Sequence, residues 1–339
     1  MYELTIVVSV LLSLILYTLT GGADFGGGMW DLLASGPRKE RQRKAIAAAL
    51  SPIWEANHVW LILVIVVLFT AFPAAFAVLM TALHIPITLM LVGIVLRGSA
   101  FIFRRYDTQS EEVRQRWGSL FGAACFFTPL TQGMVLGALA TGQIRCVDTQ
   151  VTTGFFVGWL TPFALACGLF GIVLCAFLSA IYMALYTRAE PDLQHDFCRR
   201  ALGSGLALVP LALAVFLTSQ DGAPELLRAM KQGWAPLLLA GSSLCALAAL
   251  LALWQRRFFL ARSAAVAQVT LLLTSWGCAQ YPHVIIPDVT FHQSAAPEAT
   301  LRLLTFALGM GALLLFPALL FLYQLFSRPQ TNQDTDHES

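Results

Sequence analysis

Residues 45–72 read AIAAALSPIWEANHVWLILVIVVLFTAF, a nearly unbroken apolar stretch. It is longer than the roughly 20 helical residues that cross the hydrocarbon core of a membrane. An acid, an amide and an imidazole interrupt it, namely Glu55, Asn57 and His58. Because ionisable groups are costly in hydrocarbon, their presence there indicates function by default.

The composition of the whole chain agrees with this stretch. Of the 339 residues, 58% are hydrophobic and only 12% are charged, and the mean hydropathy is +0.72. Soluble domains carry about 25% charged residues, so the composition excludes a soluble protein and indicates a polytopic membrane protein. The net charge is only +2, and we expect no nucleic-acid partner.

Nine stretches are long and apolar enough to cross a membrane, although the eighth is short. The predicted spans are residues 4–34, 45–72, 74–103, 120–140, 155–185, 201–217, 234–254, 263–279 and 303–326. We therefore predict an all-α polytopic membrane protein. Its transmembrane helical domain covers residues 1–326, and the polar tail, residues 327–339, is predicted to be a disordered cytoplasmic segment.

Lys and Arg gather in alternate loops, and short cytoplasmic loops carry the excess of these residues. With Arg97 set aside as membrane-embedded, 16 of the 21 Lys and Arg residues fall on one side and 4 on the other. The N-terminus should then lie outside and the C-terminus in the cytoplasm. Omitting the eighth span would place residues 280–300 in the cytoplasm although they contain no Lys or Arg, so nine spans fit better.

Two carboxyls fall at one membrane depth. Asp24 lies ten residues before the end of the first predicted span, and Glu55 lies ten residues after the start of the second. At about 1.5 Å of rise per residue, each is about 15 Å from the basic loop between the spans. His58 follows Glu55 by three residues and shares its helix face, where Trp54 completes a polar and aromatic stripe. Asn57 is predicted to point elsewhere, toward another helix.

Glycines surround Asp24 in the first span, among them Gly22, Gly26 and Gly28. Small residues four apart, such as Gly22 and Gly26, let another helix backbone approach closely. These glycines are therefore predicted to be helix-packing positions.

The buried acids and His58 favour a proton relay, because carboxyls in a low-dielectric setting can hold and pass protons near neutral pH. The simpler alternative is that Asp24 and Glu55 only hydrogen-bond to neighbouring helices. A metal site built from these acids and His58 is a third alternative. Haem ligation is a fourth, although His58 and His84 do not fall at matching depths.

Arg97 lies near the inner end of the third predicted span. Its long side chain can reach the headgroups or pair with an acid. We expect an interfacial anchor rather than a catalytic role.

Several motifs together resemble one family. Residues 52–62, PIWEANHVWLI, look like the second-helix signature of subunit II of the cytochrome bd quinol oxidases, and residues 22–28, GADFGGG, resemble its first-helix signature. The order and spacing hold over nearly the whole chain, and the cyanide-insensitive oxidases are one candidate branch. Supporting matches are residues 97–104, residues 159–163, Tyr281, Pro282 and Pro287.

Two positions depart from the family pattern. Ala23 stands where the family usually has an aromatic residue, and Ile102 stands where it often has an acid. Any role that the family gives to an acid at the position of Ile102 therefore does not carry over.

The resemblance implies a heterodimeric terminal oxidase of the bacterial cytoplasmic membrane. The partner, subunit I, would ligate two b-type haems and one haem d and bind quinol near the outer face, whereas this chain would ligate no haem and no metal. Both subunits would share a fold of two four-helix bundles plus one additional helix. The implied surroundings include membrane lipids and quinone, with room for a small accessory subunit.

The implied reaction oxidises quinol on the outside and reduces oxygen to water with protons drawn from the cytoplasm, which generates proton motive force without pumping. The catalytic groups would lie in subunit I. In this chain Asp24 and Glu55 would line the inner proton path, and Trp54 and His58 would shape it. Two alternatives stay open: a proton-coupled secondary transporter that uses the same acids, and an assembly subunit with no proton role.

Overall fold

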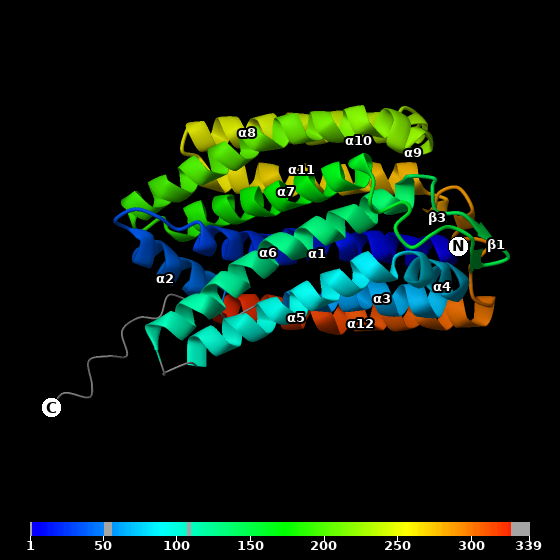
Figure 1. The fold of residues 1–339 in the computed structure, drawn as a ribbon, viewed down its shortest axis with the longest axis horizontal. Helices are drawn as coiled ribbons and strands as arrows, with labels where there is room; N and C mark the ends of the chain where they lie inside the picture. Colours follow the sequence, from blue (N-terminus) through cyan, green and yellow to red (C-terminus); the bar gives the residue numbers. More distant parts are fainter. Residues whose placement is uncertain (1, 51–55, 107–109, 327–339) are drawn as a thin grey trace.

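The computed structural model describes residues 2–50, 56–106 and 110–326. The chain is mainly helical, and its long helices lie side by side along one direction (Figure 1). In chain order the elements are α1 (Tyr2–Leu32), α2 (Lys39–Leu50), η1 (Ala56–His58, a 3-10 turn), α3 (Val59–Ala71), α4 (Pro73–Ala82), α5 (His84–Tyr106), α6 (Glu111–Ala140), β1 (Cys146–Val147), β2 (Gln150–Val151), α7 (Pro162–Tyr186), α8 (Pro191–Gly222), α9 (Pro224–Ala229), α10 (Ala235–Trp254), α11 (Phe258–Gln280), β3 (His283–Ile285), β4 (Val289–Thr290) and α12 (Glu298–Phe326).

Within the described residues, eight helices are long and apolar enough to cross a membrane. A ninth candidate is the pair formed by Ala56–Ala71 and Pro73–Ala82, whose axes are bent by 120°. The prediction of an all-α polytopic membrane protein is therefore confirmed. The helices that qualify singly are α1, α5, α6, α7, α8, α10, α11 and α12.

The second and third predicted spans are wrong as continuous helices. The first residues of the second span belong to α2, which begins at Lys39, and the 3-10 turn η1 interrupts the α-helical pattern before α3. Residues 73–82 form α4, apart from α5. The break between α3 and α4 has a local cause. Pro73 lacks an N–H group and disfavours a helical residue before it, and Phe72 accordingly has φ −134° and ψ 59°.

Helix α2 lies at one end of the bundle because its two halves differ. Its first six residues are KERQRK, and the rest of the helix is apolar. Ile46 on the apolar part is buried against Met183, Leu193 and Phe197 of α7 and α8. The charged half of α2 favours a place at the end of the bundle over the hydrocarbon core.

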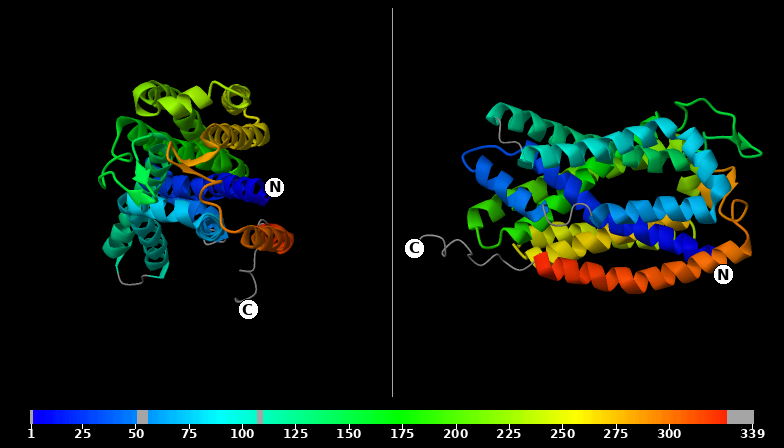
Figure 2. Two further views of the ribbon diagram at one scale, coloured as in Figure 1. Left: turned by 90° about the vertical axis from the view of Figure 1, so that its right-hand side faces the viewer. Right: turned by 90° about the horizontal axis from the view of Figure 1, so that it is seen from below.

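The helix contacts fall into two groups joined by α1 and α6. In the first group α1, α3, α5 and α6 pack together, and in the second α7, α8, α10 and α11 do so. Helix α1 runs through the middle of the molecule, where it packs against α3, α6 and α7 (Figure 1). Helix α12 lies at the edge beside α1 and α3, with most of its surface exposed (Figure 2).

Both short hairpins lie at the end where α1 begins, beside α4 and α9 (Figure 1). Asp148 and Thr149, with φ values of 47° and 66°, form the two-residue turn between β1 and β2. The Arg145 Nε donates to Asp288 at 2.8 Å and so ties the first hairpin to the second. These contacts close the bundle at this end.

The opposite end carries many of the basic residues. It contains α2, the last residues of α5, the first residues of α6 and the turn between α7 and α8 (Figure 1). Arg38 before α2 binds Asp196 of α8, with 2.6 Å between Nη2 and Oδ1. The predicted topology requires basic residues to gather at one end of the bundle, as they do here. Which end faces the cytoplasm stays a prediction.

Candidate functional site

A buried ion pair between α1 and α5 forms the centre of the site. Asp24 is 4% exposed and Arg97 is 2% exposed, and Asp24 Oδ2 lies 3.1 Å from Arg97 Nη2. The same oxygen accepts a hydrogen bond from Asn57 Nδ2 at 3.0 Å. A buried charge is tolerated when it is both paired and hydrogen-bonded, and Asp24 meets both conditions.

His58 extends this cluster on the other side of the guanidinium. Its Nε2 lies 3.3 Å from Arg97 Nη1, and its ring is flanked by the rings of Tyr17 and Phe25 at 5.9 and 6.1 Å between centroids. Its Nδ1 is buried and has no hydrogen-bond partner among the described residues. We call Asp24, Asn57, His58 and Arg97 the Asp24 cluster.

Aromatic rings enclose the guanidinium of Arg97. Its central carbon lies 5.0 Å from the centroid of the Phe25 ring and 5.9 Å from that of Phe121. Such cation–π contacts are worth about 2 kcal/mol or more when the cation is desolvated. The Arg97 charge is therefore held by an acid on one side and by ring faces on others.

A 3-10 turn brings two neighbouring residues into the cluster. In an α-helix, consecutive side chains point about 100° apart, which is why Asn57 was predicted to point away from His58. Asn57 does point to another helix, because its Nδ2 donates to Asp24 of α1 at 3.0 Å, but it does not lie apart from the site of His58. Asn57 reaches Asp24 while His58 reaches Arg97, so both side chains serve one site.

Glycines let α1 come close to its neighbours at this level. A Cβ added to Gly26 would collide with the carbonyl oxygen of Cys175 on α7, and one added to Gly28 would collide with the Cys125 sulfur on α6. At Gly22 the added atom would lie 3.3 Å from the Cys175 sulfur. The close approach at Gly26 and Gly28 holds α1 against α7 and α6 within about one helical turn of Asp24.

Two of the predicted site residues, Trp54 and Glu55, lie outside the described residues. The described chain resumes at Ala56, immediately before Asn57 and His58. Of the predicted proton-path residues, the structure therefore places Asp24 and His58, and it links them through Arg97.

The expectation that Arg97 is an interfacial anchor is wrong. An anchor would extend its charge toward the headgroups, whereas Arg97 is among the most buried side chains of the protein and pairs with Asp24. The physical reason is that the acid supplies within the bundle the counter-charge that headgroups would supply at the surface.

A second ion pair repeats this arrangement nearer the basic end. Asp31 of α1 is 2% exposed, and its Oδ2 lies 2.5 Å from Arg104 Nη1 of α5. Arg43 Nε donates to the backbone oxygen of Asp31 at 3.2 Å. The sequence analysis missed this pair. The signal was present, because seven residues separate the acids on α1 and also the arginines on α5.

Neither a metal site nor a haem-ligand pair is apparent in the described part of the chain. No group of three or more His, Cys, Asp or Glu side chains is suited to a metal ion there. His58 Nε2 faces Arg97, and His84 Nδ1 lies 2.9 Å from the backbone oxygen of Thr81. These two histidines therefore do not face a common site that a haem iron could occupy.

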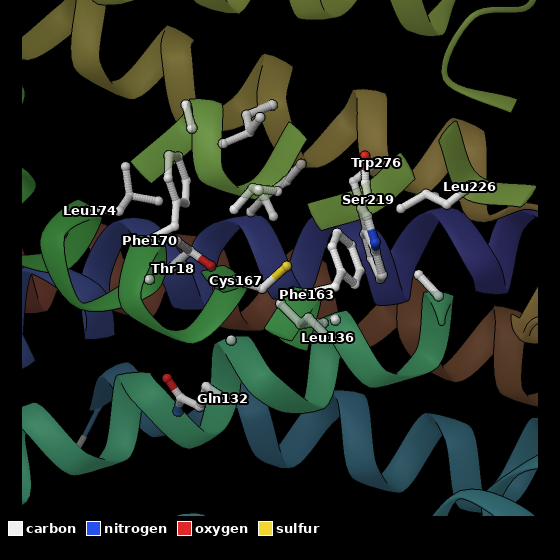
Figure 3. Close-up of a pocket in the computed structure, with 18 of the residues that line it drawn as sticks. Thr18, Gln132, Leu136, Phe163, Cys167, Phe170, Leu174, Ser219, Leu226 and Trp276 are labelled. Carbon is white, nitrogen blue, oxygen red and sulfur yellow. The ribbon is translucent and has the colours of Figure 1, made fainter. Parts of the chain in front are cut away.

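A cavity of about 370 Å³ lies next to the cluster, between α1, α6, α7, α8 and α11 (Figure 3). Its wall is mostly apolar, with Phe163 and Trp276 side by side. Tyr17 and Gln132 lie on the wall and join it to the cluster, because Gln132 Nε2 donates to the Tyr17 hydroxyl at 2.7 Å and the Tyr17 ring flanks His58. The buried charges themselves lie outside this cavity.

The comparisons with known proteins agree with one another. The family model for cytochrome bd terminal oxidase subunit II matches residues 2–326. The chain is 26% identical over 322 residues to the putative cytochrome bd menaquinol oxidase subunit II of Bacillus subtilis, a match that covers 92% of each chain. It is 30% identical over 205 residues to the cytochrome bd-I ubiquinol oxidase subunit 2 of Escherichia coli, which covers 58% of this chain and 51% of that protein.

A solved structure has the same fold. The match is to a chain of the bd oxidase from Geobacillus thermodenitrificans, with a TM-score of 0.79 and 24% identity, over 96% of this chain and 98% of that chain. The family assignment sets aside the transporter alternative and makes the chain a multi-pass protein of the bacterial inner membrane. The chain belongs to the cytochrome bd terminal oxidase subunit II family.

Proposed function

We propose that this chain works in a heterodimer with a haem-bearing subunit I, and that its Asp24 cluster, together with Glu55 and Trp54, lines the cytoplasmic proton path of the oxidase. The complex would oxidise quinol on the outer side and reduce oxygen to water with protons taken up from the cytoplasm. The observation that carries the proposal is the buried carboxylate of Asp24, held beside the turn that directly follows Glu55.

The positions of the acids on α1 support a path from the basic end. Asp31 lies next to the end of α1 at Leu32, and Asp24 lies seven residues deeper, which is about 10 Å along the helix. Arg104 and Arg43 bind Asp31 at the entrance. Buried carboxylates spaced in this way are typical of routes that carry protons into a membrane protein.

The two central acids would have different tasks. Asp24 is paired with Arg97, so it is suited to be a fixed counter-charge beside the path. Glu55 would be the group that binds and releases the proton. His58 and Trp54 would shape the path between them.

The haems would be ligated by subunit I, where they would supply the electron transfer and oxygen reduction. The positions of the histidines in this chain support that division. His58 Nε2 faces a guanidinium, which donates hydrogen bonds and cannot be displaced by an iron without breaking the cluster. His84 lies at the start of α5, 13 residues before Arg97.

The competing possibility is an assembly subunit with no proton role. In that case Asp24 would be only a structural charge that holds α1 to α5, a role its contacts also allow. Substitution of the acids distinguishes the two, because a purely structural role affects assembly and not the rate of the assembled complex.

The first experiment tests the assignment to the oxidase. The tagged chain is purified from membranes in detergent, and the reduced-minus-oxidised visible spectrum of the complex is recorded. We expect a far-red band from haem d beside b-type bands. A pull-down that contains subunit I but no haem would overturn the proposed oxidase complex.

The second experiment tests the proton path. We expect Glu55→Gln to slow oxygen consumption by at least tenfold while the haem spectrum keeps its intensity, since Gln keeps the shape of Glu but carries no proton. The matched control is Glu225→Gln, at an exposed position on α9. Unchanged turnover in Glu55→Gln would exclude an essential relay at this residue.

A further inference from the structure

The contact between Arg97 and His58 restricts the chemistry of the imidazole. A guanidinium has only donors and stays protonated in proteins, whereas a neutral imidazole has one donor nitrogen and one acceptor nitrogen. Arg97 Nη1 lies 3.3 Å from His58 Nε2, so this nitrogen has to be the acceptor. We infer that Arg97 is a positioning residue that holds His58 neutral, with the ring proton on Nδ1.

A second proton on His58 is opposed by the same contact. It would place an Nε2–H group against the guanidinium, which would remove the hydrogen bond and set two positive charges about 3.3 Å apart. Asp24 acts in the opposite direction, because its negative charge favours an imidazolium. Its Oδ2 is already paired with Arg97 Nη2 and accepts from Asn57, so among the residues that the structure describes the closest charge to His58 is positive.

The remaining neighbours of His58 in the described chain do not alter this balance. Phe25 presents an uncharged ring in an edge arrangement, with 66° between the ring planes. Tyr17 presents the tilted face of its ring, and its hydroxyl is taken by Gln132 Nε2. Neither supplies an acceptor that would draw the ring proton to Nε2.

The tautomer leaves one polar atom of the ring for the proton path. Nδ1 is buried and finds no hydrogen-bond partner in the described residues, and in this tautomer it carries a hydrogen. A buried donor needs an oxygen acceptor, since leaving it unpaired costs about 1–3 kcal/mol. His58 would therefore act as a donor that orients an oxygen on the path, and not as a base that receives the proton through Nε2.

This assignment deepens the proposed function. The tautomer follows from the contact with Arg97 alone, whereas its use in proton transfer rests on the proposed path. The two parts therefore need separate measurements, one spectroscopic and one of turnover.

The tautomer is read from nitrogen chemical shifts. The complex is labelled with ¹⁵N-histidine, reconstituted in lipid, and studied by solid-state NMR at neutral pH. A difference spectrum against His58→Gln isolates His58 from the other five histidines of this chain and from those of the partner. We expect a protonated Nδ1 and an unprotonated Nε2, and an Nε2–H tautomer or a doubly protonated ring would overturn the inference.

The cause is tested with variants of Arg97. Arg97→Met should abolish the exclusive Nδ1–H tautomer, because Nε2 loses its donor, whereas Arg97→Lys should retain it, because an ammonium group also only donates. The matched control is Arg104→Met on the same helix, which removes the ion pair with Asp31 and should leave the His58 shifts unchanged. Wild-type shifts in Arg97→Met would show that Arg97 does not set the tautomer.

The design stays informative if Arg97→Met fails to assemble. The wild-type spectrum and Arg97→Lys then decide the inference, because each can show the wrong tautomer by itself. Failure of the proposed function is seen elsewhere, as unchanged oxygen consumption in Glu55→Gln. The two results can also differ. If Glu55→Gln loses turnover but the wild type shows an Nε2–H tautomer, the proposed proton path stands and the tautomer assignment is overturned.

Discussion

Arg97 Nη2 on α5 lies 3.1 Å from Asp24 Oδ2 on α1, and both side chains are almost fully shielded from solvent. Arg104 and Asp31 repeat this relationship seven residues further along each helix. Because both partners advance in the same sense, α1 and α5 run in the same direction, with two charge pairs linking them. The inner pair joins the site, and the outer pair lies nearer the end of α1.

The inner pair should show strong coupling in a double-mutant cycle. Asp24→Ala leaves the Arg97 charge buried without its acid, which typically destabilises a protein by roughly 3–5 kcal/mol. Arg97→Met alone should have a similar effect, whereas the double variant should be more stable than the sum of the two effects predicts. The measurement is the thermal unfolding of the purified complex, followed by loss of haem absorbance.

The outer pair provides the comparison for this cycle. The Arg104 side chain is 24% exposed, so it can turn toward solvent when its acid is removed. Asp31→Ala should therefore destabilise the complex less than Asp24→Ala does. Equal loss of thermal stability in Asp24→Ala and Asp31→Ala would show that the burial of the arginine does not determine how much each ion pair stabilises the complex.

Gly26→Ala should disrupt the packing of α1 on α7. The added methyl group would overlap the carbonyl oxygen of Cys175, and backbone cannot move aside as a flexible side chain can. Overpacking of this kind costs about 1–3 kcal/mol or more, so the yield of assembled complex and its thermal midpoint should both fall. The matched control is Gly309→Ala on α12, where no atom lies within 4 Å of the added group.

The Gly309→Ala control should be neutral or slightly stabilising, because alanine is the better helix former by about 1 kcal/mol. A thermal midpoint unchanged by Gly26→Ala would contradict the close approach of α1 and α7.

The contact between the hairpins should make stability depend on pH. Partial burial opposes the ionised form of Asp288, but hydrogen bonds from Arg145 and from the Cys146 N–H outweigh it, and the pKa of Asp288 is lowered. A carboxyl whose pKa is lower in the folded state stabilises the fold above its unfolded pKa and loses that contribution as the pH falls through its folded pKa.

The thermal midpoint of the wild type should therefore exceed that of Asp288→Asn most clearly at neutral pH, and the difference should shrink in acid. The control is Asp148→Asn in the exposed turn of the first hairpin, where Asn also tolerates a positive φ. A difference that grows as the pH falls would contradict the role given to the Arg145 hydrogen bond.

Cysteine labelling should establish the predicted orientation. In a background with Cys146→Ser and Cys278→Ser, an impermeant maleimide should label Lys231→Cys in intact spheroplasts, whereas Lys44→Cys should react only after the membrane is opened. Both positions are exposed. Lys44 belongs to α2 and Lys231 lies between α9 and α10, and these elements are at opposite ends of the bundle (Figure 1). The reverse labelling pattern would show that the N-terminus is cytoplasmic, and it would place the proposed entrance at Asp31 on the outer side.

The sequence alone was enough to predict the features that depend only on residues close together in the chain. Composition and the length of apolar stretches predict a polytopic helical membrane protein, because the energy of burying a helix in hydrocarbon depends on its own residues. The glycines around Asp24 predict close helix contacts for the same reason, since a missing side chain lets any neighbour approach. The motif around Glu55 was enough to suggest the family.

Other features were decided only by the tertiary structure. The proline at position 73 was visible in the sequence and predicts a break there, but the angle of 120° between α3 and α4 is known only from the structure. The partner of Asp24 lies 73 residues away on α5, and the register of α5 against α1 depends on how both helices pack within the bundle. Local periodicity carries no information about that register, and for this reason Arg97 was predicted at the membrane surface and lies instead at the centre of the site.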